Sequence, residues 1–430
     1  MNVLYDGSVA AYCHREKKNK GGVFRVVDSL LKELLKDAEA NTKVTSFLNN
    51  ISTDDITAYL SDLGYSEKQV YTERKNVQDE IQVKEKEVAF LSSSLEQQSF
   101  LSRQLAFGTK SKFKKALERL HYLSELPLVE KGRFNIYHSP YYAVPEKIKS
   151  DKTIRTFWTS YDLIPILFPQ HFEETTINEV KQALDNLNQD SWVLCISQST
   201  RNDLLNYLGK KVDPGKVLVT PLAASENFYQ ERDKNIIRNV LTKYAVPAET
   251  PYILSLCTLE PRKNITQIIK AFSKLVRDEK IKDLNLVLAG ASGWKFDAIF
   301  EEIETSKDVK NRIYITGFVD DTDQAALYSG ARMFVYPTIY EGFGLPPLEA
   351  MQCGIPVITS DTSSLPEVVS GAGIMVNPTD LEALTQEMLN LYADQSKCDK
   401  LSALSLQKSK EFTWQQTCRQ TIESYKMSLL

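Results

Sequence analysis

Six short β-type runs alternate with helical segments of ordinary length in the second half of the chain. The runs are Tyr252–Leu256, Leu284–Ala289, Ile313–Thr316, Met333–Tyr336, Val357–Thr359 and Ile374–Val376. Strands that are joined through helices run parallel, because each crossover returns the chain to the same edge of the sheet. The pattern therefore predicts a doubly wound α/β domain whose ligands bind at the carboxyl ends of its parallel strands.

The first half of the chain also mixes strand-like and helical patterns. A short strand and turn at residues 1–7 is followed, after Gly21 and Gly22, by a run whose apolar residues have helical spacing. Further β-type runs lie at Val44–Phe47, Phe134–Tyr137, Thr153–Trp158 and Trp192–Ile196. The last run precedes a Ser-x-x-Thr-Arg-x-Asp-Leu segment, which is typical of a helix start.

The length of 430 residues exceeds what one ordinary hydrophobic core serves, so two domains are expected. We interpret the polar segment Ser225–Asp233 as the hinge between them. The predicted domains are residues 1–224 and 225–411, both α/β, and residues 412–430 are expected to form an amphipathic helix.

Residues 66–125 are predicted to be a helical insertion on the first domain, because this stretch is polar and rich in Glu, Lys and Gln. It ends in four lysines interleaved with two phenylalanines: Lys110, Lys112, Lys114 and Lys115 with Phe107 and Phe113. Two interpretations remain open. The stretch is either a solvated helical hairpin or a basic and aromatic surface for anionic lipid or a lipid-linked acceptor.

Composition narrows the class of protein. A formal net charge of -4 gives no general attraction to nucleic acid, so a nucleic-acid partner is not expected. The six cysteines show no zinc-site spacing and are interpreted as reduced thiols. Neither a signal peptide nor 18 consecutive apolar residues is found. A cytoplasmic location is expected, with peripheral contact on the inner face of the membrane as the alternative.

Two carboxylates lie eight residues apart around a Gly-Phe-Gly turn. Glu341 precedes the turn, and Glu349 lies on a helix that Pro346 and Pro347 are expected to open. Glycines let backbone N–H groups approach a ligand closely, and a helix N-terminus offers unpaired donors. The segment therefore suits an oxygen-rich ligand such as a sugar diphosphate.

Other loops are expected at the same edge of the second sheet. Arg262 and Lys263 precede a helix and form a candidate diphosphate clamp, since Arg binds phosphate bidentately and Lys supplies a point charge. A Pro-Arg-Lys turn by itself is more often a solvated loop. The remaining loops are 289–294, 316–320 and 363–368, and the second of them could place a nucleobase against backbone groups.

Three motifs resemble the family-four group of retaining glycosyltransferases. They are Thr258-Leu259-Glu260-Pro261-Arg262-Lys263-Asn264, Glu341-Gly342-Phe343-Gly344-Leu345-Pro346 with Glu349-Ala350-Met351, and Ser363-Ser364-Leu365-Pro366-Glu367-Val368. The subgroup that this chain resembles builds bacterial surface polysaccharides and includes mannosyltransferases. The resemblance implies a GT-B fold, in which two Rossmann-like domains face a cleft and the C-terminal helix crosses back to the first domain. It also implies that the second domain binds the nucleotide sugar, that the first binds mainly the acceptor, and that no metal or other cofactor is needed.

The resemblance also implies roles for individual residues. Lys263 matches the phosphate-binding lysine, and Arg262 is a second phosphate contact. Glu341 matches the carboxylate beside the donor sugar, and Glu349 matches the one that accepts hydrogen bonds from the ribose hydroxyls. The backbone groups expected at the donor are those of Phe343, Gly344 and Leu345 for sugar and phosphate, and of Gly317, Phe318 and Val319 for the base.

The chain departs from the family pattern at two positions. Cys257 stands where the family usually has Gly, and Tyr161, before Asp162, stands where many members have a catalytic His. His138, at a predicted strand end, is the alternative first-domain candidate, although a structural role is at least as good an interpretation. Gly21 and Gly22 are expected to approach the diphosphate from the first domain.

The resemblance thus implies a retaining transferase that moves a hexose from a nucleotide diphosphate sugar to a glycan or lipid-linked glycan. GDP-mannose is the first expected donor, followed by dTDP- and UDP-sugars. The alternatives are a nucleotide-sugar-binding protein without transfer activity, and an epimerase or phosphorylase on the same architecture.

Overall fold

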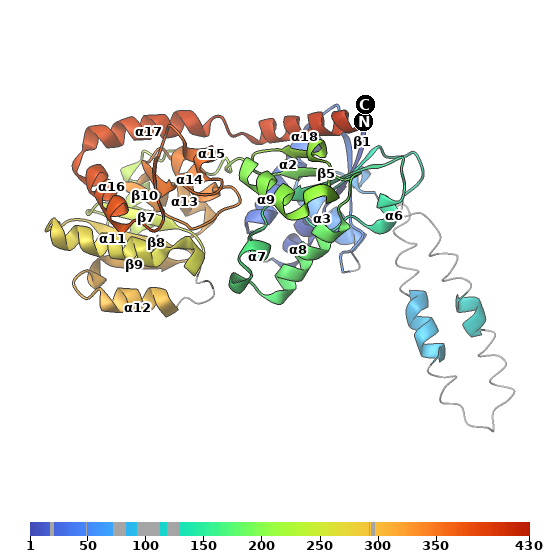
Figure 1. Ribbon diagram of the computed structural model, residues 1–430, viewed down its shortest axis with the longest axis horizontal. Coiled ribbons are helices and arrows are strands. Elements are labelled where there is room, and N and C mark those ends of the chain that lie inside the picture. Colours follow the sequence, from blue (N-terminus) through green and yellow to red (C-terminus); the bar gives the residue numbers. More distant parts are fainter. Residues whose placement is uncertain are drawn as a thin grey trace, which may run out of the picture.

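The computed structural model describes residues 1–17, 21–48, 50–71, 83–92, 112–117, 129–291, 293 and 297–430. Its core consists of two parallel six-stranded sheets, one in each half of the chain (Figure 1). The expected architecture of two Rossmann-like domains facing a cleft is confirmed.

The first sheet has the strand order β2-β1-β3-β4-β5-β6. Its strands are β1 (Asn2–Asp6), β2 (Asn41–Thr45), β3 (Ile136–Ser139), β4 (Arg155–Ser160), β5 (Trp192–Cys195) and β6 (Val217–Val219). Its helices are α1 (Ser8–Glu16), α2 (Gly22–Lys36), α3 (Thr53–Asp62), α6 (Glu146–Lys149), α7 (Ile164–Leu167), α8 (Glu174–Asn186) and α9 (Gln198–Leu208). The observed β2, β3 and β4 lie two to three residues away from the predicted runs, because pairing with neighbouring strands fixes their register.

The second sheet has the strand order β12-β11-β10-β7-β8-β9. Its strands are β7 (Tyr252–Leu256), β8 (Asn285–Ala289), β9 (Ile313–Gly317), β10 (Met333–Tyr336), β11 (Val357–Ser360) and β12 (Ile374–Val376). Its helices are α10 (Lys234–Lys243), α11 (Ile265–Asp278), α12 (Asp297–Thr305), α13 (Asp321–Ser329), α14 (Leu345–Gln352), α15 (Leu365–Val369), α16 (Leu381–Ala393) and α17 (Gln395–Ser409). Every residue of β8, β10 and β11 is buried, as expected for a parallel sheet with helices on both faces.

The last helix, α18 (Trp414–Leu429), lies on the first domain, and Figure 1 shows α17 and α18 running along the two domains in succession. Its buried Cys418, Ile422 and Tyr425 join the core that contains β1 and α2. The crossing of the C-terminal helix back to the first domain is thus confirmed. Residues 220–233 contain neither helix nor strand, and we propose domain limits of 1–224 with 412–430, and 225–411.

The described part of the insertion contains helical residues 83–92 and 112–117, which protrude from the first domain in Figure 1. Residues 67–71 belong to the domain itself, because Val70 forms a bridge with Val44 and the N–H of Tyr71 donates to Val44 O. Lys110 and Phe107 lie outside the described residues. In the part of the chain that the structure describes, no helix combines the length and the apolar character needed to cross a bilayer.

Candidate active site

A cavity of about 730 Å³ lies between the two domains, at the carboxyl ends of the strands. The first domain contributes Gly21, Gly22 and Arg25 from the start of α2, and Tyr161 and Asp162 from the end of β4. From the second domain, most of the expected donor residues line it: Arg262, Lys263, Phe318, Val319, Glu341, Phe343, Gly344, Leu345 and Glu349. Gly317 ends β9 beside the cavity but does not line it, and its φ of 68° is in the left-handed region.

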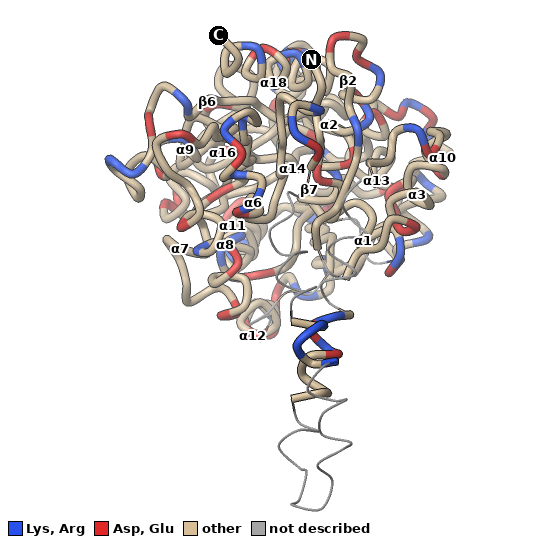
Figure 2. The backbone as a smooth tube through the Cα atoms, turned by 90° about the vertical axis from the view of Figure 1, so that its right-hand side faces the viewer, with Lys and Arg blue, Asp and Glu red and all other residues tan. Residues whose placement is uncertain are grey.

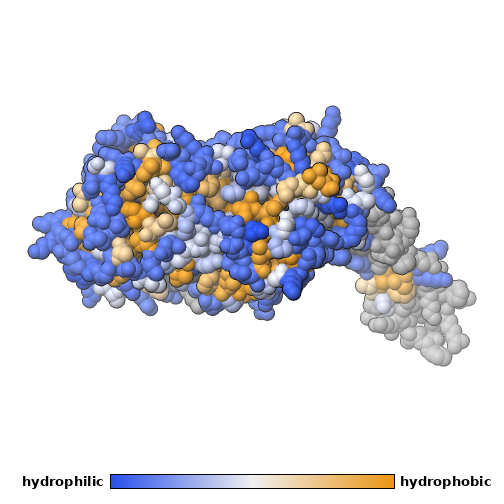
Figure 3. Space-filling model, turned by 45° about the horizontal axis from the view of Figure 1, so that its top comes forward, coloured by the Kyte–Doolittle hydropathy of each residue, from blue (hydrophilic) through white to orange (hydrophobic). Residues whose placement is uncertain are grey.

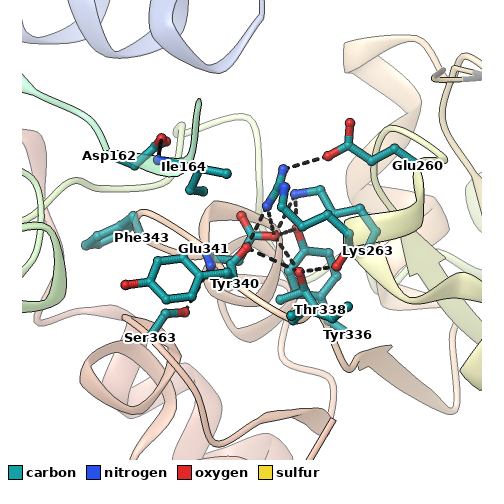
Figure 4. Close-up of polar contacts among 12 residues, drawn as sticks. Asp162, Ile164, Glu260, Lys263, Tyr336, Thr338, Tyr340, Glu341, Phe343 and Ser363 are labelled. Atoms are coloured by element: carbon teal, nitrogen blue, oxygen red, sulfur yellow. Dashed lines mark hydrogen bonds and ion pairs between the residues drawn. The ribbon is translucent and has the colours of Figure 1, made fainter. Parts of the chain in front are cut away.

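Glu341 is the centre of a buried charge network in this cavity (Figure 4). One carboxylate oxygen, Oε1, lies 2.6 Å from Lys263 Nζ and 3.0 Å from Arg262 Nη1. The same oxygen accepts hydrogen bonds from the hydroxyls of Thr338 at 2.9 Å and Tyr336 at 3.0 Å. Burial raises the pKa of Glu341, but the two cations outweigh burial and lower this pKa to about 2. Glu341 is therefore ionised at neutral pH.

Arg262 is held through both of its Nη atoms, whereas its Nε has no hydrogen-bond partner among the described residues. Its Nη2 donates to Glu260 Oε1 at 2.6 Å, and its Nη1 donates to Tyr340 O at 2.6 Å. Its Nε is buried and has no hydrogen-bond partner among the described residues. A buried donor without an acceptor is costly, so Nε is suited to an incoming anionic oxygen.

Local backbone geometry explains how the Glu341 loop is shaped. Gly344 precedes α14 with a φ of 112°, and a Cβ at this residue would lie 2.7 Å from Leu365 Cδ2. Pro346 is in the first turn of α14, which confirms the expected helix start. Ser363, with a φ of 52°, accepts the N–H of Glu341 on its Oγ at 2.9 Å. The serines of the third motif thus fix the loop that carries Glu341.

Glu349 is buried on α14, with only 4% of its surface exposed. It accepts a hydrogen bond from Tyr328 OH at 3.2 Å and faces Arg25 Nη1 at 3.4 Å. Arg25 also pairs with Asp321 at 3.0 Å, so an arginine of the first domain bridges two carboxylates of the second. Burial raises the pKa of Glu349 to about 7, although Arg25 and Tyr328 both oppose this rise.

The sequence did not identify Arg25 as a site residue. It lies three positions after Gly22, in a run recognised only for its helical periodicity. Arg25 is one of several charged residues in this amphipathic run, and the run itself does not say which of them faces the second domain.

His138 is not part of the cavity. It is fully buried, with Nδ1 2.6 Å from Tyr425 OH on α18 and Nε2 2.8 Å from Thr159 Oγ1. Burial lowers the pKa of His138 to about 3, so the ring is neutral. The structure therefore places His138 in the contact between the first sheet and the C-terminal helix.

Tyr161 and Asp162 are partly buried and line the cavity from the first domain. Burial raises the pKa of Tyr161, so its phenol is neutral. Asp162 accepts the N–H of Ile164 at 2.9 Å, and burial raises its pKa as well. Figure 4 shows Asp162 on the opposite side of Glu341 from Lys263. Tyr161 and Asp162 thus bring a phenol and a carboxyl group from the end of β4 to the cavity.

Cys257 lines the cavity and is 7% exposed. Its carbonyl oxygen would lie 1.9 Å from a Cβ at Gly290, so the loops after β7 and β8 are in close contact. Burial raises the pKa of the thiol to about 12, which keeps it neutral and weakly nucleophilic. Among the described residues, no group of three or more His, Cys, Asp or Glu side chains could hold a metal ion.

Comparisons with known proteins agree with this geometry. Residues 237–407 match the family described as glycosyl transferases group 1. The chain is 32% identical over 293 residues to the O-antigen chain mannosyltransferase B of Escherichia coli, and the match covers 68% of this chain and 74% of that protein. It is 31% identical over 278 residues to the serotype-specific mannosyltransferase WbdA of the same organism, covering 63% of this chain but only 33% of that protein. The fold is shared with Anabaena HepE in complex with UDP and glucose, with a TM-score of 0.63, 16% identity and 100% of both chains covered.

Proposed function

This chain belongs to the group 1 glycosyltransferases, and from that premise we propose that it moves a hexose from a nucleotide diphosphate sugar to a glycan or lipid-linked glycan. GDP-mannose is the first candidate donor, because the similar E. coli proteins are named mannosyltransferases. We place the reaction in surface polysaccharide synthesis on the cytoplasmic side of the membrane. The observation that carries the proposal is the pairing of buried Lys263 and partly buried Arg262 with Glu341 in the interdomain cavity.

The proposed mechanism follows from the charges that develop as the bond between the sugar and the diphosphate breaks. Breaking the anomeric C–O bond places negative charge on the departing diphosphate and positive charge on the sugar ring. Arg262 and Lys263 stabilise the leaving group, with backbone N–H groups of the loop before α14 as further donors. Glu341, ionised beside the sugar, orients it and stabilises its positive charge. The leaving phosphate accepts the proton of the acceptor on the same face, and configuration is retained.

The nucleoside end is proposed to bind near α13 and α14. Glu349 accepts hydrogen bonds from the ribose hydroxyls, and the backbone at residues 317–319 meets the base. Phe318 is 51% exposed and lines the cavity, so its ring can cover one face of the base. With two cations at the diphosphate, we propose that no metal ion is needed.

The first domain is proposed to hold the acceptor. Tyr161 and Asp162 line the cavity, and the ring of Tyr141 lies 6.3 Å from that of Tyr161. Aromatic faces beside a carboxylate suit a sugar, which offers apolar C–H faces and hydroxyl donors. This arrangement supports a glycan as the acceptor.

The test of the function is nucleoside diphosphate release from a panel of GDP-, UDP- and dTDP-sugars, with and without a glycan acceptor. Acceptor-dependent release from one donor would establish transfer and identify the donor. Nucleotide binding without release from any donor would support the binding-protein alternative. Conversion of the donor without an acceptor would support an epimerase.

The affinity for the donor is expected to fall as pH decreases below about 7, where Glu349 becomes protonated. A protonated carboxyl accepts fewer hydrogen bonds from ribose hydroxyls than an ionised one. Calorimetric titration with GDP between pH 6 and 8 measures this. The Glu349→Gln variant, whose side chain does not titrate, corrects for titration of the phosphate itself. Equal pH profiles in the two proteins would contradict the assignment.

The raised pKa of Glu349 also makes the stability of the protein depend on pH. The usual pKa of a glutamate is 4.5 and that of Glu349 in the folded protein is about 7, so folding takes up a proton between these values. The contribution of Glu349 to the free energy of unfolding therefore decreases as pH rises through this window. A smaller decrease in Glu349→Gln, measured by urea unfolding at pH 5 and pH 8, is expected.

Peripheral membrane contact is proposed through the insertion. Val83 is 62% and Phe90 is 70% exposed, and hydrophobic residues are visible on the described part of the insertion in Figure 3. Basic and acidic residues both occur along the same part of the backbone in Figure 2. Each lysine near an anionic membrane surface contributes about 1 kcal/mol to binding.

Replacing Lys110, Lys112, Lys114 and Lys115 with serine is expected to abolish co-sedimentation with anionic liposomes. Vesicles of neutral phosphatidylcholine serve as the control surface, because they offer no net negative charge. Unchanged sedimentation with anionic vesicles would favour the solvated hairpin.

A further inference from the structure

The start of α9 in the first domain contacts the Glu341 loop of the second domain. Ser197 Oγ donates a hydrogen bond to Gly342 O at 2.7 Å. Thr200 Oγ1 lies 3.2 Å from the same carbonyl oxygen and 3.1 Å from Tyr161 O. Ser197 and Thr200 are buried, so these hydrogen bonds are shielded from water.

A carboxylate of the second domain caps the same helix. Glu367, on α15, accepts the N–H of Gln198 at 2.7 Å and the N–H of Ser199 at 2.8 Å, one on each oxygen. These donors belong to the first turn of α9, where backbone N–H groups lack partners within the helix and a negative charge is favoured. We call Ser197, Thr200 and Glu367 the interdomain clasp.

The interdomain clasp holds the Gly342–Phe343 peptide group of the Glu341 loop. The carbonyls on either side of it are held within the second domain, because Ser364 Oγ lies 3.0 Å from Glu341 O and 2.7 Å from Phe343 O. Among the described residues, the hydrogen-bond partners of Gly342 O are Ser197 and Thr200, both in the first domain. The orientation of this peptide therefore depends on contact between the domains.

The orientation of the Gly342–Phe343 peptide determines where its N–H group points. In a trans peptide the C=O and the following N–H point in opposite directions. With Gly342 O turned toward α9, the N–H of Phe343 is turned away from α9, on a residue that lines the cavity. The two domains are also in close contact here, because a Cβ at Gly342 would lie 2.7 Å from Tyr161 O.

We infer that Ser197 and Glu367 are positioning residues for sugar transfer, which fix the Gly342–Phe343 peptide in its donor-binding orientation only while the domains are in contact. The inference rests on the proposed function for its effect on turnover. The Phe343 N–H belongs to the second domain but is oriented by the first. The site for the nucleotide sugar is therefore complete only while the two domains are in contact.

The decisive comparison is between Ser197→Ala and Ser52→Ala. Both serines cap a helix by accepting a backbone N–H at 3.0 Å, but Ser52 caps α3 within the first domain and is exposed. Loss of either cap lowers stability to a similar extent. Ser197→Ala is expected to lower kcat about tenfold or more, since it also removes the hydrogen bond to Gly342 O.

GDP affinity and the radius of gyration distinguish a positioning role of Ser197 from a general loss of stability. GDP affinity of Ser197→Ala is expected to fall by a smaller factor than kcat, because the proposed ribose and base contacts lie in the second domain and only one hydrogen-bond donor to the diphosphate is misoriented. The radius of gyration from small-angle X-ray scattering is expected to increase in Ser197→Ala and to remain unchanged in Ser52→Ala. Glu367→Gln, which keeps one amide oxygen but loses the charge, is expected to show the same changes to a smaller extent.

Equal kcat values for Ser197→Ala and Ser52→Ala would overturn the inference. So would scattering curves of Ser197→Ala and Glu367→Gln that superimpose on wild type. The scattering measurement needs no donor sugar, so it still tests the clasp if wild type releases nucleotide from no donor, a result that would reject the proposed function alone.

Discussion

Replacing Glu341 with alanine is expected to lower kcat by about two to four powers of ten. The carboxylate lies 2.6 Å from Lys263 Nζ and has a pKa of about 2, so it is a fixed negative charge that needs no reorganisation during the reaction. Its removal also leaves Arg262 and Lys263 without this counter-charge. The variant is therefore expected to bind GDP at least as tightly as wild type while losing turnover.

The matched control is Glu249→Ala, which removes a glutamate of the second domain whose side chain is 78% exposed and pairs with Arg238 at the surface. Wild-type kcat is expected for this variant. Because buried Lys263 and partly buried Arg262 destabilise the fold without their carboxylate, circular dichroism and a GDP-dependent rise in Tm should establish that Glu341→Ala is folded. Near-normal turnover in the folded variant would reject the assigned role.

Lys263→Ala is expected to lower kcat/KM by about two to three powers of ten. Lys263 is 9% exposed and lies 2.7 Å from Tyr336 OH as well as beside Glu341. It is the largest of the favourable influences that lower the pKa of Glu341, so this pKa should rise in the variant. Unlike Glu341→Ala, the variant should bind GDP more weakly, because a cation at the diphosphate has been lost.

Lys270→Ala is the control for Lys263→Ala, since Lys270 lies on α11, is 49% exposed and pairs with Glu302 at 3.6 Å. Lys263→Arg should not restore full activity, because the planar guanidinium differs in shape from the ammonium that fits between Glu341 and Tyr336. Wild-type GDP affinity and turnover in Lys263→Ala would place the diphosphate elsewhere in the cavity.

Much of the second domain followed from local sequence. Parallel strands buried on both faces give apolar runs, and crossover helices separate them at regular intervals, so the six strands were recognisable without tertiary information. The loops after these strands necessarily meet at one sheet edge. Arg262, Lys263, Glu341 and Glu349 were therefore placed together correctly from their positions in the pattern.

The tertiary structure alone decided which residues from segments distant in sequence contact one another. His138 was a reasonable candidate from its strand end, but α18 covers it and Tyr425 takes its Nδ1. Arg25 reaches Glu349 across 324 positions, and Ser197 reaches Gly342 across 145. In the second domain, the sequence determined to within about one residue where each strand ends, because periodicity and turn chemistry are local. Which residue of one domain faces which residue of the other depends on how two separately folded cores pack, and no local pattern carries that information.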